Sequence, residues 1–266
     1  SPALRWWLGE PPPPCSPPAC VRGGRDWMIF PDSGQAVCWI GDWLVRWDLS
    51  PLGFLRTAAH GHLDALHLSL WLQDVAVVVD PGTGAYYGDT RLRAWLASWK
   101  AHNGPQVPGV DFPRRLGPFL WSSHHSRPTW RALDECTLEG ELILPHGVAR
   151  RLVRRVADAG RDGWQVDDWF GMAADQDQTG RRSSDTFEVR WQFAPGTRLL
   201  SEPGNTHFYR AERRGVRFTV GFDAAWRRVQ FFPETSGSLR LPIAGDLAGV
   251  CSSAFRRVEA GPFVVL

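Results

Sequence analysis

The sequence predicts an all-β protein with one short helix, arranged as an antiparallel β-sandwich or as stacked sheets. Short apolar segments recur along the chain with turn-forming residues between them, whereas a single segment shows helical periodicity. The chain of 266 residues contains 27 glycines and 21 prolines, a share above the usual one, which indicates many turns. Its 15 tryptophans supply large apolar side chains for a core.

The N-terminal segment does not fit a regular element. Proline runs at 11–14 and 17–18 are compatible with neither a helix nor a central strand. We therefore expect residues 1–30 to form a linker or the remnant of an upstream element, and residues 31–266 to form the sandwich. The chain begins without methionine and without the charged and apolar regions of a signal peptide, so we expect it to be processed or cut from a longer chain.

Two β-hairpins follow this segment. Strand-like residues flank two-residue turns at 41–42 and 73–74. The strands are 35–40 and 43–49 in the first hairpin, and 66–72 and 75–80 in the second. The last of these strands is apolar enough to be buried on both faces.

The hydrophobic period changes between Arg91 and Lys100. The apolar side chains that share one helical face there are Leu92, Trp95, Leu96 and Trp99. Their spacing predicts an amphipathic helix of about three turns.

The second half of the chain predicts further strands separated by turns that contain glycine or proline. They are residues 149–156, 164–170, 186–193, 206–212, 216–222 and 228–232, followed by a short C-terminal pair. Two charged groups lie within this part. We expect the arginines at 150, 151, 154 and 155 to form a solvated face, with contact to an anionic glycan as the alternative. We expect Asp167 and Asp168 to lie in a solvated turn rather than in a calcium site.

Charge and apolar content exclude several classes of protein. Thirty basic and 28 acidic residues leave a net charge of +2, without a basic patch of the kind that binds nucleic acid. The longest apolar runs, such as 75–79, are far shorter than the roughly 20 residues of a membrane-spanning helix. Five cysteines do not form a disulfide framework in a chain of this length, although Cys15 and Cys20 could pair.

Histidine and aspartate side chains gather near the ends of the second hairpin. His62 precedes its first strand and Asp80 ends its second strand, so the two return to one edge of the sheet. The loop after the predicted helix can bring His102 to the same place. Two imidazoles and one carboxylate are standard ligands for zinc or a similar divalent metal. The alternative is that each histidine caps a turn and that residues 80–82 form an ordinary turn.

Six short motifs, in order, resemble the heparinase II/III family of polysaccharide lyases. They are FPDSG at 30–34, DLSPLG at 48–53, AAHGHLDAL at 58–66, VDPGT at 79–83, AHN at 101–103 and GPFLW at 117–121. The resemblance implies a large two-layer antiparallel β-sandwich, a supersandwich, that follows an α/α toroid domain with the active cleft between the two. Beyond residue 122, the chain matches the family in strand pattern only.

The resemblance also implies roles for individual residues. His62, Asp80 and His102 match the ligands of a structural zinc in the family. His60, the first histidine of the His-x-His-x-Asp motif, matches a catalytic residue that faces the cleft, and Tyr86 matches a tyrosine near the site. The positions around the predicted site that depart from the family pattern are Gly84, Ala97, Trp99 and Gly104.

The activity implied by the resemblance is β-elimination on a uronate-bearing glycan such as a glycosaminoglycan or alginate. The reaction needs neutralisation of the uronate carboxylate, a base for the α-proton and an acid for the departing oxygen. Because an imidazole titrates near neutral pH, His60 can act as base or acid, and Tyr86 can donate to the leaving oxygen. We expect Arg91 and Arg93 to bind anionic groups and Trp95 to stack on a sugar ring.

In the family, an asparagine that neutralises the carboxylate and a principal catalytic tyrosine come from the toroid. We therefore expect the isolated chain to be a weak or inactive catalyst. The expected partners are an acidic polysaccharide and an upstream toroid, the expected cofactor is zinc, and the expected location is a bacterial periplasm or cell envelope. A second hypothesis is a non-catalytic glycan-binding or structural sandwich with a stabilising metal.

Overall fold

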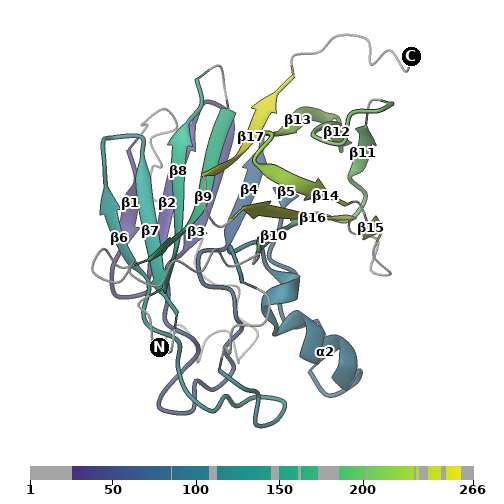
Figure 1. The fold of residues 1–266 in the computed structure, drawn as a ribbon. Helices are drawn as coiled ribbons and strands as arrows, with labels where there is room; N and C mark the ends of the chain where they lie inside the picture. The colour runs from purple at the N-terminus through teal and green to yellow at the C-terminus, as the bar shows by residue number, and fades with distance from the viewer. Residues whose placement is uncertain are drawn as a thin grey trace, which may run out of the picture.

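In the computed structural model, the described strands form two antiparallel sheets that face each other, with a helix at one end (Figure 1). The structure describes residues 26–84, 86–107, 113–144, 150–160, 163–172, 186–201, 203–230, 232–233, 239–246 and 250–258. The predicted all-β sandwich is confirmed. Within these ranges, no helix is long and apolar enough to cross a membrane.

The first sheet joins the N-terminal hairpins to strands from the C-terminal half of the chain. Its order is β1 (Met28–Phe30), β2 (Gln35–Ile40), β3 (Trp43–Asp48), β4 (Leu68–Leu72), β5 (Val75–Val78), β10 (Thr186–Phe193), β16 (Leu239–Asp246) and β14 (Trp226–Val229), with β15 (Phe232–Pro233) also paired to β16. Both predicted hairpins are present. Strand β1 lies within the predicted linker and pairs with β2. Cys15, Cys20 and the proline runs lie outside the described residues.

The second sheet is built from later strands. Its order is β11 (Arg198–Ser201), β12 (Phe208–Arg213), β13 (Val216–Phe222), β17 (Cys251–Arg257), β9 (Gly163–Met172), β8 (Arg150–Asp158), β7 (Leu138–Ile143) and β6 (Thr129–Ala132). The sequence pattern does not predict the edge strands β6 and β11. Both are largely exposed, so they lack the apolar alternation of a half-buried strand.

Aromatic rings fill the space between the sheets. Trp43 of β3 meets Phe218 of β13 with 6.1 Å between ring centroids, and Trp191 of β10 meets Phe255 of β17 at 4.8 Å. All four side chains are fully buried. Edge-to-face packing of this kind adds to the free energy of apolar burial, so these rings hold the two sheets together.

The core also contains an ion pair. Arg154 on β8 lies directly opposite Asp168 on β9, and both are fully buried. The guanidinium donates to both carboxylate oxygens, at 2.7 and 2.9 Å. The expectation of a solvated arginine face and a solvated aspartate turn is wrong at these two positions. Strand alternation places Arg154 on the inward face of β8, together with the buried Leu152 and Val156.

The observed helix is shorter than the helix that the hydrophobic pattern predicts. Helix α2 spans Thr90–Leu96, and a turn of 3-10 helix, η1, spans Trp99–Ala101. Ser98 separates them, because its backbone is extended and its hydroxyl donates to the carbonyl oxygen of Trp95. Figure 1 places α2 at one end of the sandwich, beside the long loops that precede β4 and β6.

Candidate functional site

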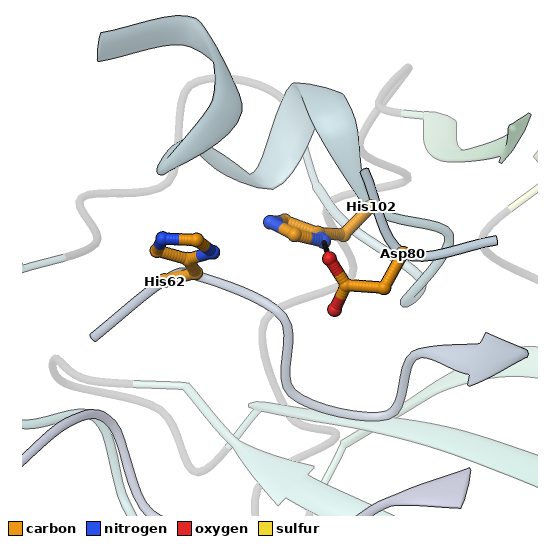
Figure 2. Close-up of side chains that lie close together, drawn as sticks. All are labelled: His62, Asp80 and His102. Atoms are coloured by element: carbon orange, nitrogen blue, oxygen red, sulfur yellow. Dashed lines mark ion pairs between the residues drawn. The ribbon is translucent and has the colours of Figure 1, made fainter. Parts of the chain in front are cut away.

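Two histidines and an aspartate converge near α2. His62 belongs to the loop before β4, Asp80 follows β5, and His102 follows η1. One ligand atom from each of the three residues lies within 4.8 Å of the other two. Figure 2 shows the three side chains gathered around a common space. The structure thus brings together the three residues that the sequence predicts as metal ligands.

The ring of His102 is oriented with one nitrogen available to a metal. Its Nε2 lies 3.0 Å from the carbonyl oxygen of Leu96, which can only accept, so Nε2 carries the proton. Nδ1 therefore carries a lone pair. It is buried, it has no hydrogen-bond partner among the described residues, and it lies 3.8 Å from Oδ1 of Asp80. A buried lone pair facing a carboxylate is unfavourable unless a cation lies between them, so the arrangement fits a metal ion.

Burial also favours the protonation state that a metal requires. Burial, followed by the neighbouring charge of His102, lowers the pKa of His62 to about 4, and burial lowers the pKa of His102. Burial alone would raise the pKa of Asp80, but His67, His102, the backbone N–H of Gly82 and His62 together outweigh it and lower that pKa to about 2. At neutral pH the site therefore presents two neutral imidazoles and one carboxylate, the forms that bind zinc.

Acid should destabilise the metal-free protein as the pH falls from about 6.5 to about 4. In this interval, unfolded His62 binds a proton near its ordinary pKa of 6.5, whereas folded His62, with a pKa of about 4, does not. The unfolded state therefore binds more protons, so the free energy of unfolding is fully retained above pH 6.5 and declines toward pH 4. Urea unfolding of chelator-treated protein measures how steeply the free energy of unfolding changes with pH across this range. A His62→Gln variant should show a shallower dependence on pH. An equal dependence in both proteins would contradict the lowered pKa of His62 as its cause.

The segment after His102 is fixed against the start of β4. The Asn103 side chain accepts from the backbone N–H of Leu68 at 2.7 Å and donates to the Leu68 carbonyl at 2.6 Å. Gly104 packs against the chain so closely that a Cβ there would lie 2.1 Å from the carbonyl oxygen of Ala65. These contacts set the position from which the His102 ring reaches the cluster.

The buried ion pair of the core extends to this segment. Besides its contacts with Asp168, Arg154 donates through Nη1 to the carbonyl oxygen of Leu66 at 3.0 Å and to Oδ1 of Asn103 at 2.9 Å. Arg154, which belongs to the second sheet, thereby fixes Leu66 and Asn103 beside the start of β4 in the first sheet. The position of His102 thus depends on a hydrogen-bond network that crosses the interior of the sandwich.

His67 supports the cluster without being available as a ligand. Its Nδ1 accepts from the backbone N–H of Asn103 at 3.2 Å, so Nε2 carries the proton and donates to Oγ of Ser69 at 3.2 Å. Its ring lies edge-on to that of His102, with 5.5 Å between centroids. His67 is therefore a buried histidine with a hydrogen-bond partner for each ring nitrogen.

A second cluster, of aromatic rings, lies beside the first. His60, two residues before His62, is exposed, and its backbone N–H donates to the carbonyl oxygen of Phe119 at 2.8 Å. Its ring is parallel to that of Tyr86 at 6.3 Å between centroids and tilted toward that of Phe119 at 5.1 Å. The two residues predicted as catalytic are therefore neighbours on the surface.

The three residues predicted to bind substrate occupy different environments. Arg93 is buried, and its guanidinium lies over the rings of Phe119 and Tyr86, 4.2 and 4.9 Å from their centroids. Arg91 is exposed on α2, and Trp95 is half-buried. The structure thus places Arg93 inside the aromatic cluster, where it supports the rings of Tyr86 and Phe119 through cation–π contact.

Sequence reasoning assigned no role to Phe119 or to the turn before it. The motif at 117–121 carries part of the family resemblance, but its spacing from the other motifs does not reveal a contact. In the structure, Phe119 touches His60, Tyr86 and Arg93, and so connects the loop before β6 to the site. The available signal was an aromatic residue directly after the turn-forming pair Gly117 and Pro118.

The fold and the site define a class of protein, an antiparallel β-sandwich with a His-Asp-His cluster suited to a metal beside an exposed aromatic cluster. The chain belongs to the heparinase II/III-like, C-terminal family, whose model matches residues 22–242. The comparison with curated protein sequences gave no match.

Solved structures with a similar fold include a heparinase III gene product and the heparan sulfate lyase HepC from Pedobacter heparinus. The heparinase III aligns with a TM-score of 0.64 and 13% identity, over 88% of this chain and 36% of its own. HepC aligns with a TM-score of 0.62 and 13% identity, over 88% of this chain and 37% of its own. This chain therefore spans little more than a third of the length of these two proteins, and at such low identity the likeness is one of fold.

Proposed function

We propose that this chain is the zinc-containing β-sandwich portion of a polysaccharide lyase that cleaves uronate-bearing acidic glycans by β-elimination. The observation that carries the proposal is the juxtaposition of two groups, the cluster of His62, Asp80 and His102 and the neighbouring pair of His60 and Tyr86. Family membership and the lyase titles of structures with the same fold support the same reaction class.

The metal is proposed to have a structural role. His62, Asp80 and His102 would hold a zinc ion, and the bound ion would join three separate segments of the chain at one point. The lone pair of His102 Nδ1, buried and without a partner among the described residues, supports this assignment. His102 is 1% exposed and Asp80 is half-buried, so these groups are poorly placed to meet a polymer.

His60 and Tyr86, by contrast, lie at the surface. His60 is exposed and Tyr86 is 48% exposed, so a glycan can reach both side chains. In the proposed reaction, His60 takes up the α-proton of the uronate, and the phenol of Tyr86 donates its proton to the departing oxygen. The C–O bond to the leaving sugar breaks as the new C=C bond forms, so the products are an unsaturated uronate and a free hydroxyl end.

Neutralisation of the uronate carboxylate is assigned to an upstream α/α toroid domain. Among the described residues, the side chains that pack on His60 are the aromatic rings of Tyr86 and Phe119, with Arg93 behind them, and none of these is an asparagine. Dividing the catalytic groups between two domains makes their relative position decisive for rate.

The second candidate function is a glycan-binding or structural sandwich without catalysis. The observation that favours it lies at Gly104, where the chain departs from the pattern it resembles. Because a Cβ at this position would lie 2.1 Å from Ala65 O, the segment after His102 cannot carry a side chain there without moving. Gly104 is buried, so this close packing beside the proposed ligand His102 favours a structural role for the segment.

The 266-residue chain alone should release no unsaturated uronate from heparan sulfate or another acidic polysaccharide. Addition of an upstream toroid, fused or mixed in trans, should restore turnover, because it supplies the missing catalytic groups. Ultraviolet absorbance of the unsaturated product measures the reaction. If the isolated chain catalyses elimination and the His60→Ala variant does not, the sandwich carries a complete active site. That result would overturn the proposed division of catalytic groups between two domains. Glycan binding without turnover in the two-domain protein would favour the non-catalytic function.

A further inference from the structure

A pocket lies beside the aromatic cluster, between α2 and the turn that leads to Phe119. Its volume is about 450 Å³, and it is lined by Thr90, Arg93, Arg115, Leu116, Gly117 and Pro118. Arg93 connects the pocket to the candidate site, because it lines the pocket and also lies over the rings of Tyr86 and Phe119.

Two guanidinium groups lie side by side at this pocket. Nε of Arg93 donates to the carbonyl oxygen of Pro118 at 2.9 Å, and Nη2 of Arg115 donates to the same oxygen at 3.3 Å. One acceptor thus holds two cations together. Like charges so close repel each other, and an anion bound between them would remove that cost.

The surroundings of Arg115 also favour an anion bound at the pocket. Arg115 makes no ion pair within the described part of the chain, and the charged group that lowers its pKa, after burial, is the second cation, Arg93. The aromatic rings of Tyr86 and Phe119 cover the Arg93 guanidinium, so this side chain is held in place rather than free to turn toward solvent. The half-buried Arg115 is the one of the two that can adjust to a ligand.

We propose that this pocket binds an anionic group of the glycan, a sulfate or a uronate carboxylate, on a sugar next to the one that is cleaved. A guanidinium donates two parallel hydrogen bonds to such oxyanions, and the exposed hydroxyl of Thr90 at the rim can donate a third. The proposal rests on the proposed function for the identity of the ligand as an acidic glycan. It adds a residue, Arg115, and a recognition element that neither the motifs nor the comparisons assign.

The test compares Arg115→Gln with Arg114→Gln in the 266-residue chain. Arg114 is the exposed neighbour of Arg115 and does not line the pocket, so both variants remove one positive charge from the same loop. Calorimetry with a heparan sulfate oligosaccharide should show binding weakened about tenfold or more by Arg115→Gln and little changed by Arg114→Gln. Titrations with inorganic sulfate and with glucuronate identify which anion the pocket holds. Equal weakening by the two variants, or no effect of either, would overturn the proposal.

Activity of the two-domain protein separates this proposal from the proposed function. If elimination proceeds and Arg115→Gln leaves KM and binding unchanged, the pocket assignment fails while the lyase assignment stands. If no elimination is detected but oligosaccharide or sulfate binding still depends on Arg115, the lyase assignment fails while the pocket stands. Melting temperatures of both variants should equal that of the parent chain, because each side chain is on a loop outside the core.

Discussion

Replacing Arg154 by methionine should lower the free energy of unfolding by about 3–5 kcal/mol, the usual cost of breaking a buried ion pair at one partner. Asp168 would keep its carboxylate in the core without a counter-charge, and burial already acts to raise its pKa. The carbonyl oxygen of Leu66 and Oδ1 of Asn103 would each lose a buried donor as well.

Arg155→Met is the matched control. Arg155 is the next residue on β8 but points outward, where it pairs with Glu139 at 2.9 Å while more than a third exposed. Its loss should cost only about 1 kcal/mol, because the partner Glu139, although mostly buried, keeps its ion pair with Arg131 at 2.6 Å. Urea unfolding of both variants measures the difference, and the double variant Arg154→Met/Asp168→Leu should recover part of the loss, since an apolar pair can replace a buried ion pair. Similar losses for Arg154→Met and Arg155→Met would show that the buried pair does not stabilise the fold as argued.

The two histidines of the His-x-His motif should respond in opposite ways to replacement by alanine. In the two-domain protein, His60→Ala should reduce elimination about 100-fold or more, the range of a lost general acid or base. Its melting temperature should barely change, because the side chain is exposed and its backbone N–H bond to Phe119 survives the substitution.

His62→Ala should instead lower the melting temperature and reduce zinc content. It removes a partly buried ring that lies 5.6 Å from that of His102, between ring centroids, and takes away one of the three proposed zinc ligands. Thermal unfolding, metal analysis and elimination rate, measured on both variants, separate the roles. Equal destabilisation by the two substitutions would make His60 a structural residue and remove it from the proposed chemistry.

Much of the fold follows from periodicity. The segments now seen as β2, β10 and β13 begin and end where the sequence predicts, because each alternates clearly and is bounded by turn residues. The helix follows the same rule only in part. Its apolar spacing continues to Trp99, but the Ser98 hydroxyl competes for a backbone carbonyl and ends α2 at Leu96.

Contacts between distant segments are less predictable. The hairpin that ends at Asp80 brings this residue back to the edge of the sheet where His62 lies. The proximity of these two cluster residues is therefore predictable from the hairpin alone. The position of His102 depends on Asn103 and on Arg154 from the opposite sheet, which sequence spacing does not reveal. The inward direction of Arg154 was available from strand alternation, but an arginine is expected to be solvated until its buried partner Asp168 is known.

Metal analysis of the purified chain tests the proposed centre most directly, because the roles assigned to His62, Asp80 and His102 all depend on a bound ion. After zinc loading and removal of excess metal, the parent chain should retain about one zinc per molecule. His62→Ala, Asp80→Asn and His102→Ala should each lose it, whereas Arg114→Gln should keep it. A parent chain that holds no zinc, or the three ligand variants retaining as much as the parent, would contradict the metal centre.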